Sequence, residues 1–433
     1  MLTVQKDNTK EEKPIYNNPR INETKYENLD SEENNYPDFS YTYQYDELGR
    51  LSKQLSKKRD YPYEYKVGVD KEFKYKPSTS LISQEKYIST TGPTDSPFTT
   101  CVEYNLSYET IQNNLYTGNI SEIEESGSRF IEIPIQEDKL ITKPLVNRKY
   151  NYTYDSFNRL IKEEKTEDNV LTETIEYEYS NIGTLDKVKV NGTTTKEFVC
   201  EKGRLKTLNS KSILYDYYGN IVNDTKGTIS YNSRNLLSKY IVQKEVENNA
   251  YNLKFEHNFY YNYNNVRYKK VVKEIINGVL NDSYTVKYHL DGNKILGEDV
   301  INSANEITKM FRYYYDINGI CGMFCVDYST AKIFEYVFVK DPLGNITKLL
   351  RKGLVVGEYI YDAWGNCTVN ELMEYADEDS KLLDRYVLNY NPYRWKGYYY
   401  DVESSFNGIP KIRNKVITII IDGKPSFFFI PNF

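Results

Sequence analysis

Residues 43–51 read YQYDELGRL, and residues 152–160 repeat the phrase as YTYDSFNRL. Two tyrosines separated by one residue point to the same face of an extended strand. Asp46 at the first position and Gly49 at the fourth position fit a type I turn, where Gly can take the positive φ of a following bulge. The leucine after the turn begins a return strand. Each copy of the phrase therefore predicts a β-hairpin.

The phrase recurs along the chain at irregular intervals. Clear later copies are 215–221 (YDYYGNI), 313–319 (YYYDING), 341–346 (DPLGNI) and 359–366 (YIYDAWGN), and degenerate copies are 179–185, 231–236 and 290–295. From residue 155 onward, the Asp position or its substitute recurs every 16 to 39 residues. This spacing is too irregular for a strict solenoid, but it suits hairpins of variable length lying side by side.

The composition agrees with a fold made of strands. The 433 residues include 45 Tyr, 17 Phe and two Trp, but only five Ala. Tyr, Val, Ile and Thr favour pleated surfaces, whereas few Ala argue against long helices. We predict an all-β fold with little helix, in which the hairpins form a wide and rather polar β-sheet. One helical candidate is 371–386, where an acidic stretch leaves an exposed loop equally compatible.

Four motifs in the second half carry a family resemblance. They are 311–316 (FRYYYD), 339–346 (VKDPLGNI), 361–366 (YDAWGN) and 391–401 (NPYRWKGYYYD). In this order they resemble the RHS-repeat-associated core. With the upstream repeats, most of the chain from about 41 to 404 resembles RHS/YD-repeat proteins of the bacterial polymorphic-toxin and cell wall-associated type. The resemblance implies that the hairpins form a long curled or spiralling β-sheet, which makes a partial shell, or cocoon.

Four segments follow from these patterns. Residues 1–40 are rich in Glu, Asn, Lys and Pro, so we expect poor order there. Residues 41–300 form the YD/RHS repeat strip with irregular loops, and 301–404 form the RHS-repeat-associated core. Residues 405–433 are a divergent tail, whose two apolar runs predict a hairpin.

The tail also marks a departure from the family pattern. Members of this family enclose a C-terminal toxin, and many cleave themselves at the far end of the core. The words that normally follow the YYYD of residues 398–401 are missing from this chain. The core is therefore interpreted as truncated, no cleavage residue is assigned, and the tail is too short for a toxin domain.

Charge and hydropathy exclude some classes of partner. The 56 basic and 62 acidic residues are interspersed and give a net charge of −6, which is not the basic patch of a nucleic-acid-binding protein. No apolar run approaches the roughly 18 residues of a membrane span. The first residues lack the apolar region of a signal peptide, although the resemblance implies a secreted or cell-surface protein.

The chain offers no catalytic, cofactor-binding or metal-binding residues that we can select. Common nucleotide-binding, zinc-protease and serine-hydrolase motifs are missing, and His257 and His289 are the only histidines. Five cysteines with wide spacing do not describe a disulfide framework. Cys321 and Cys325 would share one strand face if the strand between them stayed extended. We assign Gly344, Gly365 and Arg394 structural roles, the last through stacking on or pairing with aromatic neighbours.

We therefore expect a non-catalytic shell or scaffold fragment of a toxin-delivery or cell-contact protein that lacks a toxin domain. Its partners would be a C-terminal toxin of the parent system or the immunity protein of that toxin. A carbohydrate- or cell wall-binding surface is the first alternative, because tyrosine-rich sheets can stack on sugars. A residual self-processing enzyme is the second alternative.

Overall fold

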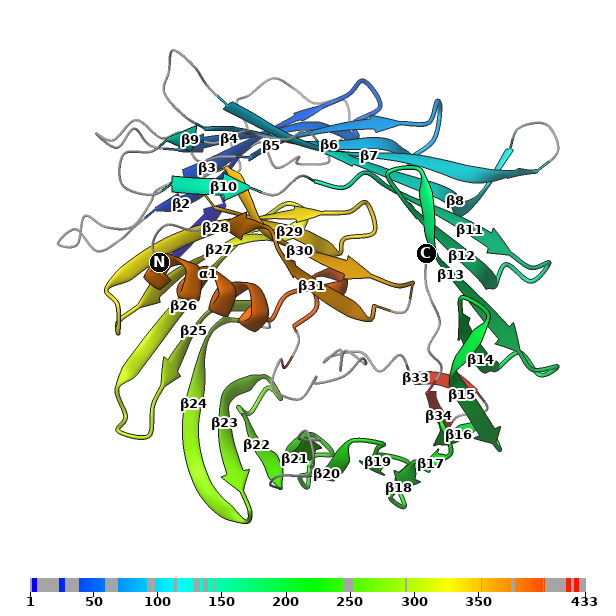
Figure 1. The fold of residues 1–433 in the computed structure, drawn as a ribbon, viewed down its shortest axis with the longest axis vertical. Helices are drawn as coiled ribbons and strands as arrows, with labels where there is room; N and C mark the ends of the chain where they lie inside the picture. The colour runs from blue at the N-terminus through cyan, green and yellow to red at the C-terminus, as the bar shows by residue number, and fades with distance from the viewer. Residues whose placement is uncertain are drawn as a thin grey trace.

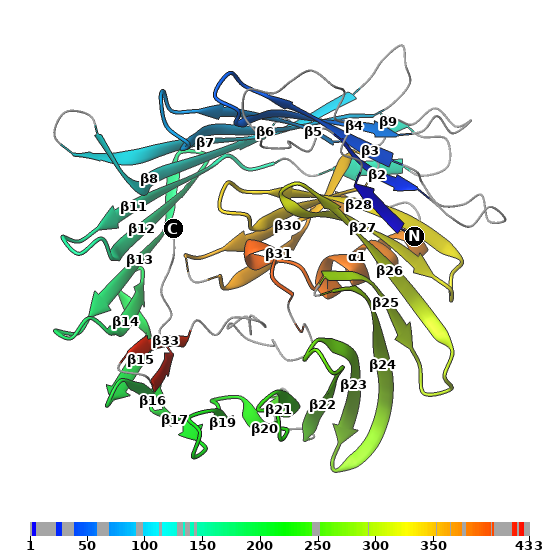
Figure 2. The same ribbon diagram turned by 180° about the vertical axis from the view of Figure 1, so that it is seen from behind.

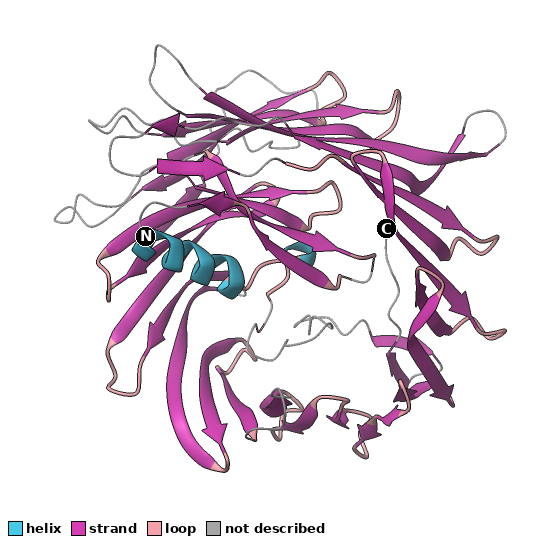
Figure 3. Cartoon of the chain, viewed as in Figure 1, coloured by secondary structure: helices cyan, strands magenta, loops and turns pink. Residues whose placement is uncertain are grey.

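The computed structural model describes residues 2–5, 23–27, 39–58, 69–91, 98–111, 115–127, 133–134, 139–142, 145–244, 252–292, 294–351, 353–363, 365–374, 378–399, 401, 418–421 and 424–427. Strands dominate this part of the chain, which confirms the all-β prediction (Figure 3). Most of 1–40 and of the tail lies outside the described residues. Within the tail, β33 (Thr418–Ile421) and β34 (Lys424–Phe427) pair antiparallel as a sheet of their own.

Two large antiparallel sheets account for most of the described strands, and their order follows the chain. The first sheet contains β1 (Leu2–Gln5), β2 (Glu23–Glu27), β3 (Phe39–Tyr45), β4 (Leu51–Lys58), β5 (Val69–Tyr75), β6 (Ile82–Thr91), β7 (Phe98–Ile111), β8 (Leu115–Gly127), β11 (Arg148–Tyr154), β12 (Leu160–Glu167), β13 (Val170–Tyr179), β14 (Leu185–Val190), β15 (Thr193–Glu201), β16 (Arg204–Leu208) and β17 (Lys211–Ser212).

The second sheet continues in the same manner. It contains β18 (Leu214–Tyr215), β19 (Ile221–Asn223), β20 (Gly227–Tyr231), β21 (Leu237–Lys244), β22 (Leu253–Tyr261), β23 (Arg267–Ile276), β24 (Val279–Asp291), β25 (Lys294–Ile301), β26 (Ile307–Asp316), β27 (Gly319–Asp327), β28 (Lys332–Lys340), β29 (Ile346–Arg351), β30 (Leu354–Tyr361) and β31 (Cys367–Glu371). A small third sheet joins β32 (Met373–Glu374), β10 (Lys139–Thr142) and β9 (Ile133–Pro134). Pairing runs through β25 and β26, so the division at 300/301 stays a prediction from the motifs alone.

The two large sheets curl around a common centre, and strands β26–β31 lie beneath strands β3–β8 (Figures 1 and 2). We call β3–β8, β11 and β12 the outer layer, and β26–β31 the inner layer. Val102 and Tyr104 of the outer layer share one buried cluster with Leu350 and Val355 of the inner layer. The strip is thus a curled sheet, not closed into a barrel, whose ends overlap.

A helix covers the free face of the inner layer. Leu383, Val387 and Leu388 of α1 (Glu378–Tyr390) are buried in the cluster that also holds Phe338 and Val356. Strand β29 is buried at every position because the outer layer lies on one face and α1 lies on the other. The predicted helical range 371–386 was wrong at its start, since residue 371 ends β31.

The repeated phrase forms the predicted turn. In the β3–β4 hairpin, the amide of Gly49 donates to the carbonyl of Asp46 at 2.8 Å, and Gly49 has a φ of 80°. The Asp46 carboxylate accepts the amide of Arg50 at 2.8 Å and its Nε at 2.6 Å. The aspartate therefore caps the turn that it begins, which explains its place in the motif.

The second tyrosine of the phrase links each hairpin to the one before it. The hydroxyl of Tyr179 donates to the carbonyl of Leu160 at 2.9 Å, that of Tyr261 donates to Leu237 at 2.8 Å, and that of Tyr361 donates to Ile346 at 2.7 Å. In each pair the acceptor is the first residue of the preceding return strand. The ring packs in the sheet while the hydroxyl satisfies a backbone group, which explains the preference for Tyr over Phe.

Removing one of these hydroxyls should cost stability. We expect Tyr261→Phe to lower the free energy of unfolding by about 0.5–1.5 kcal/mol, the usual value of one such bond. Tyr263→Phe in the same hairpin is the control, because Tyr263 is 88% exposed and should change stability by less than about 0.5 kcal/mol. Urea unfolding of both variants measures the difference. Equal effects would contradict the role given to the Tyr261 hydroxyl.

A β-bulge separates the two nearby cysteines. Tyr314 pairs with Gly322 and Tyr315 pairs with Ile320, so Cys321 is the extra residue of β27. Cys321 consequently belongs to the cluster that contains Tyr41 of the outer layer, whereas Cys325 belongs to the cluster beneath α1. Because the strand is not regularly extended between them, Cys321 and Cys325 do not share one face, and neither forms a disulfide.

Candidate functional site: the interface between the two layers

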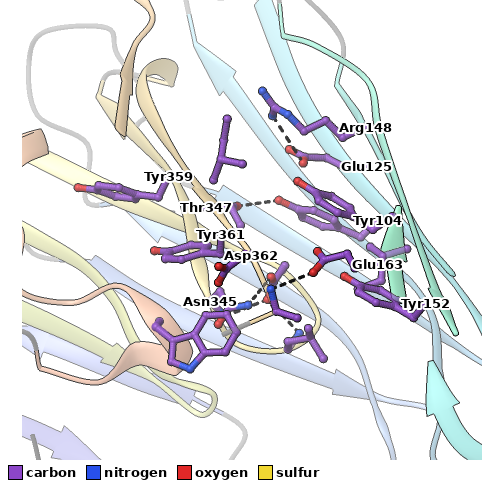
Figure 4. A pocket seen from close by; sticks show the side chains of 17 residues that line it. Tyr104, Glu125, Arg148, Tyr152, Glu163, Asn345, Thr347, Tyr359, Tyr361 and Asp362 are labelled. Atoms are coloured by element: carbon purple, nitrogen blue, oxygen red, sulfur yellow. Dashed lines mark hydrogen bonds and ion pairs between the residues drawn. The ribbon is translucent and has the colours of Figure 1, made fainter. Parts of the chain in front are cut away.

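The interface between the layers is the place where residues far apart in the sequence meet. A small cavity of about 50 Å³ lies there, between strands of the outer layer and the hairpins β28–β29 and β30–β31 (Figure 4). Side chains of the outer layer, such as Tyr104 and Glu163, point toward Thr347 and Asp362 of the inner layer. The hydroxyls of Tyr104 and Thr347 are 2.7 Å apart and form a buried hydrogen bond.

Four charged residues form an ion-pair cluster beside this cavity. Arg148 of β11 makes a two-pronged bond to Glu358 of β30, with distances of 2.8 and 2.7 Å. Lys348 of β29 bonds to Glu125 of β8 and lies 3.5 Å from Glu358. Burial alone would raise the pKa of Glu358, but the bonds from Arg148 and the charge of Lys348 outweigh it and lower this pKa to about 2. The cluster holds the two layers in one register, because each charge needs its partner across the interface.

The Glu163 carboxylate lies in the same interface but lacks such a partner. It accepts the backbone amide of Ala363 at 3.1 Å and the hydroxyl of Tyr177 at 3.2 Å. Among the described residues, no lysine or arginine forms an ion pair with Glu163. Burial and the nearby charge of Asp362 raise the pKa of Glu163 to about 8. Burial likewise raises the pKa of Asp341, which caps the β28–β29 turn, to about 7.

A second ion pair fixes the start of the outer layer. Lys71 of β5 lies 2.7 Å from Asp316 at the end of β26, and the side-chain amide of Gln54 donates to the same carboxylate at 3.1 Å. Burial opposes the charge on Asp316, but the charges of Lys71 and Lys340 lower its pKa. Asp316, the aspartate of the phrase at 313–319, therefore forms bonds across the layers.

The motif at 391–401 crosses the inner layer and connects several strands. The backbone carbonyl of Arg394 accepts the amide of Ile346 at 3.0 Å, and its guanidinium lies 5.0 Å from the centre of the Tyr359 ring. Stacking of Arg394 on an aromatic neighbour is thus confirmed. A short turn η3 (Trp395–Gly397) follows, and Asp401 then pairs with Arg267 at 2.9 Å and with Lys270 at 3.4 Å on β23.

The remaining candidate groups do not assemble into a site within the described part of the chain. His257 is buried between the rings of Tyr240 and Phe259, whereas His289 on β24 bonds to Asp299 at 2.7 Å. The described ranges contain no group of three His, Cys, Asp or Glu side chains placed to hold a metal ion. None of the helices described has the length and apolar character needed to cross a membrane.

The ion pairs across the interface were missed at the level of sequence. A usable signal exists, because Lys348 and Glu358 stand inside apolar strands, in ITKLLR and LVVGEYIY. A charge in such a strand predicts a buried partner. The identity of the partner is not contained in the strand itself.

Comparison with known proteins supports the architecture. No family model matches the chain. The tRNA nuclease WapA of Bacillus subtilis (strain 168) is 26% identical over 256 residues, which are 58% of this chain and 9% of that protein. The tRNA3(Ser)-specific nuclease WapA of Bacillus spizizenii shows the same identity and coverage. The chain thus spans about a tenth of the length of these relatives.

A solved structure shares the curled arrangement. It is the Photorhabdus luminescens Tc holotoxin pore with a substitution in TccC3, at a TM-score of 0.53 and 16% identity, over 84% of this chain and 18% of that chain. The curled sheet of hairpins and the repeated motifs of this chain are thus those of the RHS/YD-repeat fold. In this chain, the motifs at 341–346, 361–366 and 391–401 supply the turns and the crossing segment that build the inner layer.

Proposed function

We propose that this RHS/YD-repeat protein is a non-catalytic shell segment of a bacterial toxin-delivery or cell-contact protein. The observation that carries the proposal is the ion-pair cluster of Arg148, Lys348, Glu125 and Glu358. It joins the outer layer to the inner layer, so side-chain contacts hold the curl in place. A curled wall with a fixed overlap suits a role in enclosing or presenting another polypeptide.

The size of the interlayer cavity supports a structural role for its polar groups. Its 50 Å³ is far below the roughly 300–1,000 Å³ of ordinary ligand pockets. Within the wall, Arg148 and Lys348 bond to Glu125 and Glu358, and these four side chains are at most 6% exposed. Charged side chains that are buried and bonded to one another are poorly placed to act on a nucleic acid or a peptide.

The relatives suggest the kind of partner. The two WapA proteins are named as tRNA nucleases, so a toxin of the parent system, carried after the core, is the proposed cargo. An immunity protein would then be a partner of that toxin. A secreted or cell-surface location belongs to the same proposal.

Intact mass and tRNA cleavage test the non-catalytic role together. We expect the purified chain to keep its mass of 51.0 kDa over days at 25 °C and to leave bulk tRNA uncut. A chain boiled before the assay is the control for contaminating nuclease. Two fragments whose masses add up to the intact value would support self-processing instead. If the tRNA-cleaving activity instead co-purified with the folded chain, the chain would be a nuclease.

A carbohydrate-binding surface is the second candidate, and exposed tyrosines favour it. Tyr217 and Tyr263 are 95% and 88% exposed at the tips of the β18–β19 and β22–β23 turns. Alternate turns of an antiparallel meander lie at the same rim, so these rings share one edge of the strip. Retention of the chain on peptidoglycan, and its loss in a Tyr217→Ser and Tyr263→Ser variant, would favour this candidate over the shell alone.

A further inference from the structure

The tip of the β30–β31 hairpin enters the outer layer at Glu163. Ala363 at this tip is buried in one cluster with Leu160, Ile175 and Tyr177 of the outer layer. Its amide donates to the Glu163 carboxylate at 3.1 Å. The next residue back, Asp362, caps the turn by accepting the amide of Asn366 at 2.9 Å. Two carboxyl groups therefore face each other across the interface, one from each layer.

We infer that the Glu163–Ala363 contact is a pH-sensitive connection between the layers, which holds the hairpin tip while the carboxyl is neutral and loosens when it ionises. The ion-pair cluster provides the contrast within the same interface. There Arg148 and Lys348 neutralise Glu358, whereas Glu163 meets Asp362 without a cation of its own. This inference concerns the wall itself and does not depend on the proposed function.

Charged and titratable groups approach Glu163 from each neighbouring element. Strand β13 contributes Tyr177, which donates to Glu163, and Glu173, whose charge opposes the ionisation of Glu163. Strand β11 contributes Tyr150 and Tyr152. Strand β15 contributes Lys196, whose charge interacts with that of Asp362. In the adjacent β28–β29 turn, Asp341 is accompanied by Lys396. None of these groups gives Glu163 an ion pair in the part of the chain that the structure describes.

The direction of the pH effect follows from the raised pKa. Burial and Asp362 outweigh the bond from the Ala363 amide and raise the pKa of Glu163 to about 8, above its ordinary value of about 4.3. The stabilising contribution of the neutral carboxyl is complete below the ordinary value and is lost as pH rises through about 8. Burial also raises the pKa of Asp341 in the adjacent turn, to about 7, so the contribution of this second carboxyl group is tested by a variant of its own. The connection is therefore closed at mildly acidic pH and weakened in alkaline solution.

Tryptophan fluorescence reports on this hairpin. The chain contains two tryptophans: Trp364 precedes Gly365 in the sequence, and Trp395 lines the cavity. Between pH 5 and 9 we expect the emission of the unaltered chain to shift with a midpoint near pH 8. In Glu163→Gln the amide oxygen still accepts the Ala363 amide but cannot ionise, so the amplitude should fall at least fivefold. Asp341→Asn is the matched control and should keep the transition near pH 8.

Hydrogen exchange provides a second readout for the same variants. After correction for intrinsic rates, peptides of β30 and β31 should lose at least tenfold protection between pH 6 and 9 in the unaltered chain, and less than twofold in Glu163→Gln. Circular dichroism first confirms that the variants fold. A Glu163→Gln chain that keeps the full transition would overturn the inference. So would loss of the transition in Asp341→Asn alone, or no transition in the unaltered chain.

Discussion

Replacing Glu358 with alanine should lower the free energy of unfolding by about 3–5 kcal/mol, because it leaves buried positive charge without its partner. Arg148 and Glu358 are 3% and 4% exposed, and Lys348 lies 3.5 Å from the same carboxylate. The Arg148 guanidinium would then keep only Glu125 and Glu167 of its own layer. Lys348 would keep only Glu125 across the interface. Urea unfolding followed by far-UV circular dichroism measures the loss.

Two further variants separate this effect from simple truncation. Glu72→Ala removes one partner of the exposed pair with Lys53, which are 2.7 Å apart, and should cost less than about 1 kcal/mol. A double variant, Arg148→Met with Glu358→Leu, removes both charges and should recover part of the stability lost by Glu358→Ala, since buried apolar replacements are often neutral. If Glu358→Ala were no more harmful than Glu72→Ala, the ion-pair cluster would not hold the layers together.

Replacing Gly365 with alanine should destabilise the protein by about 2–5 kcal/mol in total. Its φ of 79° already costs a side-chain residue about 1–2 kcal/mol. A Cβ atom there would also lie 2.6 Å from Cδ2 of Trp395, and such overpacking adds about 1–3 kcal/mol. Thermal unfolding and tryptophan fluorescence measure the two consequences.

Gly344→Ala is the matched control for this substitution. Gly344 stands at the same turn position with a φ of 85°, but no atom lies within 4 Å of its added Cβ. It should therefore cost only the backbone strain of about 1–2 kcal/mol. Equal losses in the two variants would contradict the close contact between the β30–β31 turn and Trp395.

The hairpins were predictable because their bonds are local. Asp46 caps a turn whose donors lie within four residues, and the φ of Gly49 follows from the same short motif. The helix was less predictable, since residue 371 still belongs to strand β31 and α1 begins only at residue 378. Its position depends on the apolar face of the inner layer, which the segment does not contain.

The sequence by itself determined the turns, the alternation of strands and the family to which the motifs belong, because each depends on residues near one another in the chain. The overlap of the layers was decided only by the tertiary structure. Arg148 and Glu358 are 210 positions apart, and Glu163 and Ala363 are 200 positions apart. Whether they meet depends on the twist and curvature summed over all the strands between them, and small changes per strand would bring other residues together.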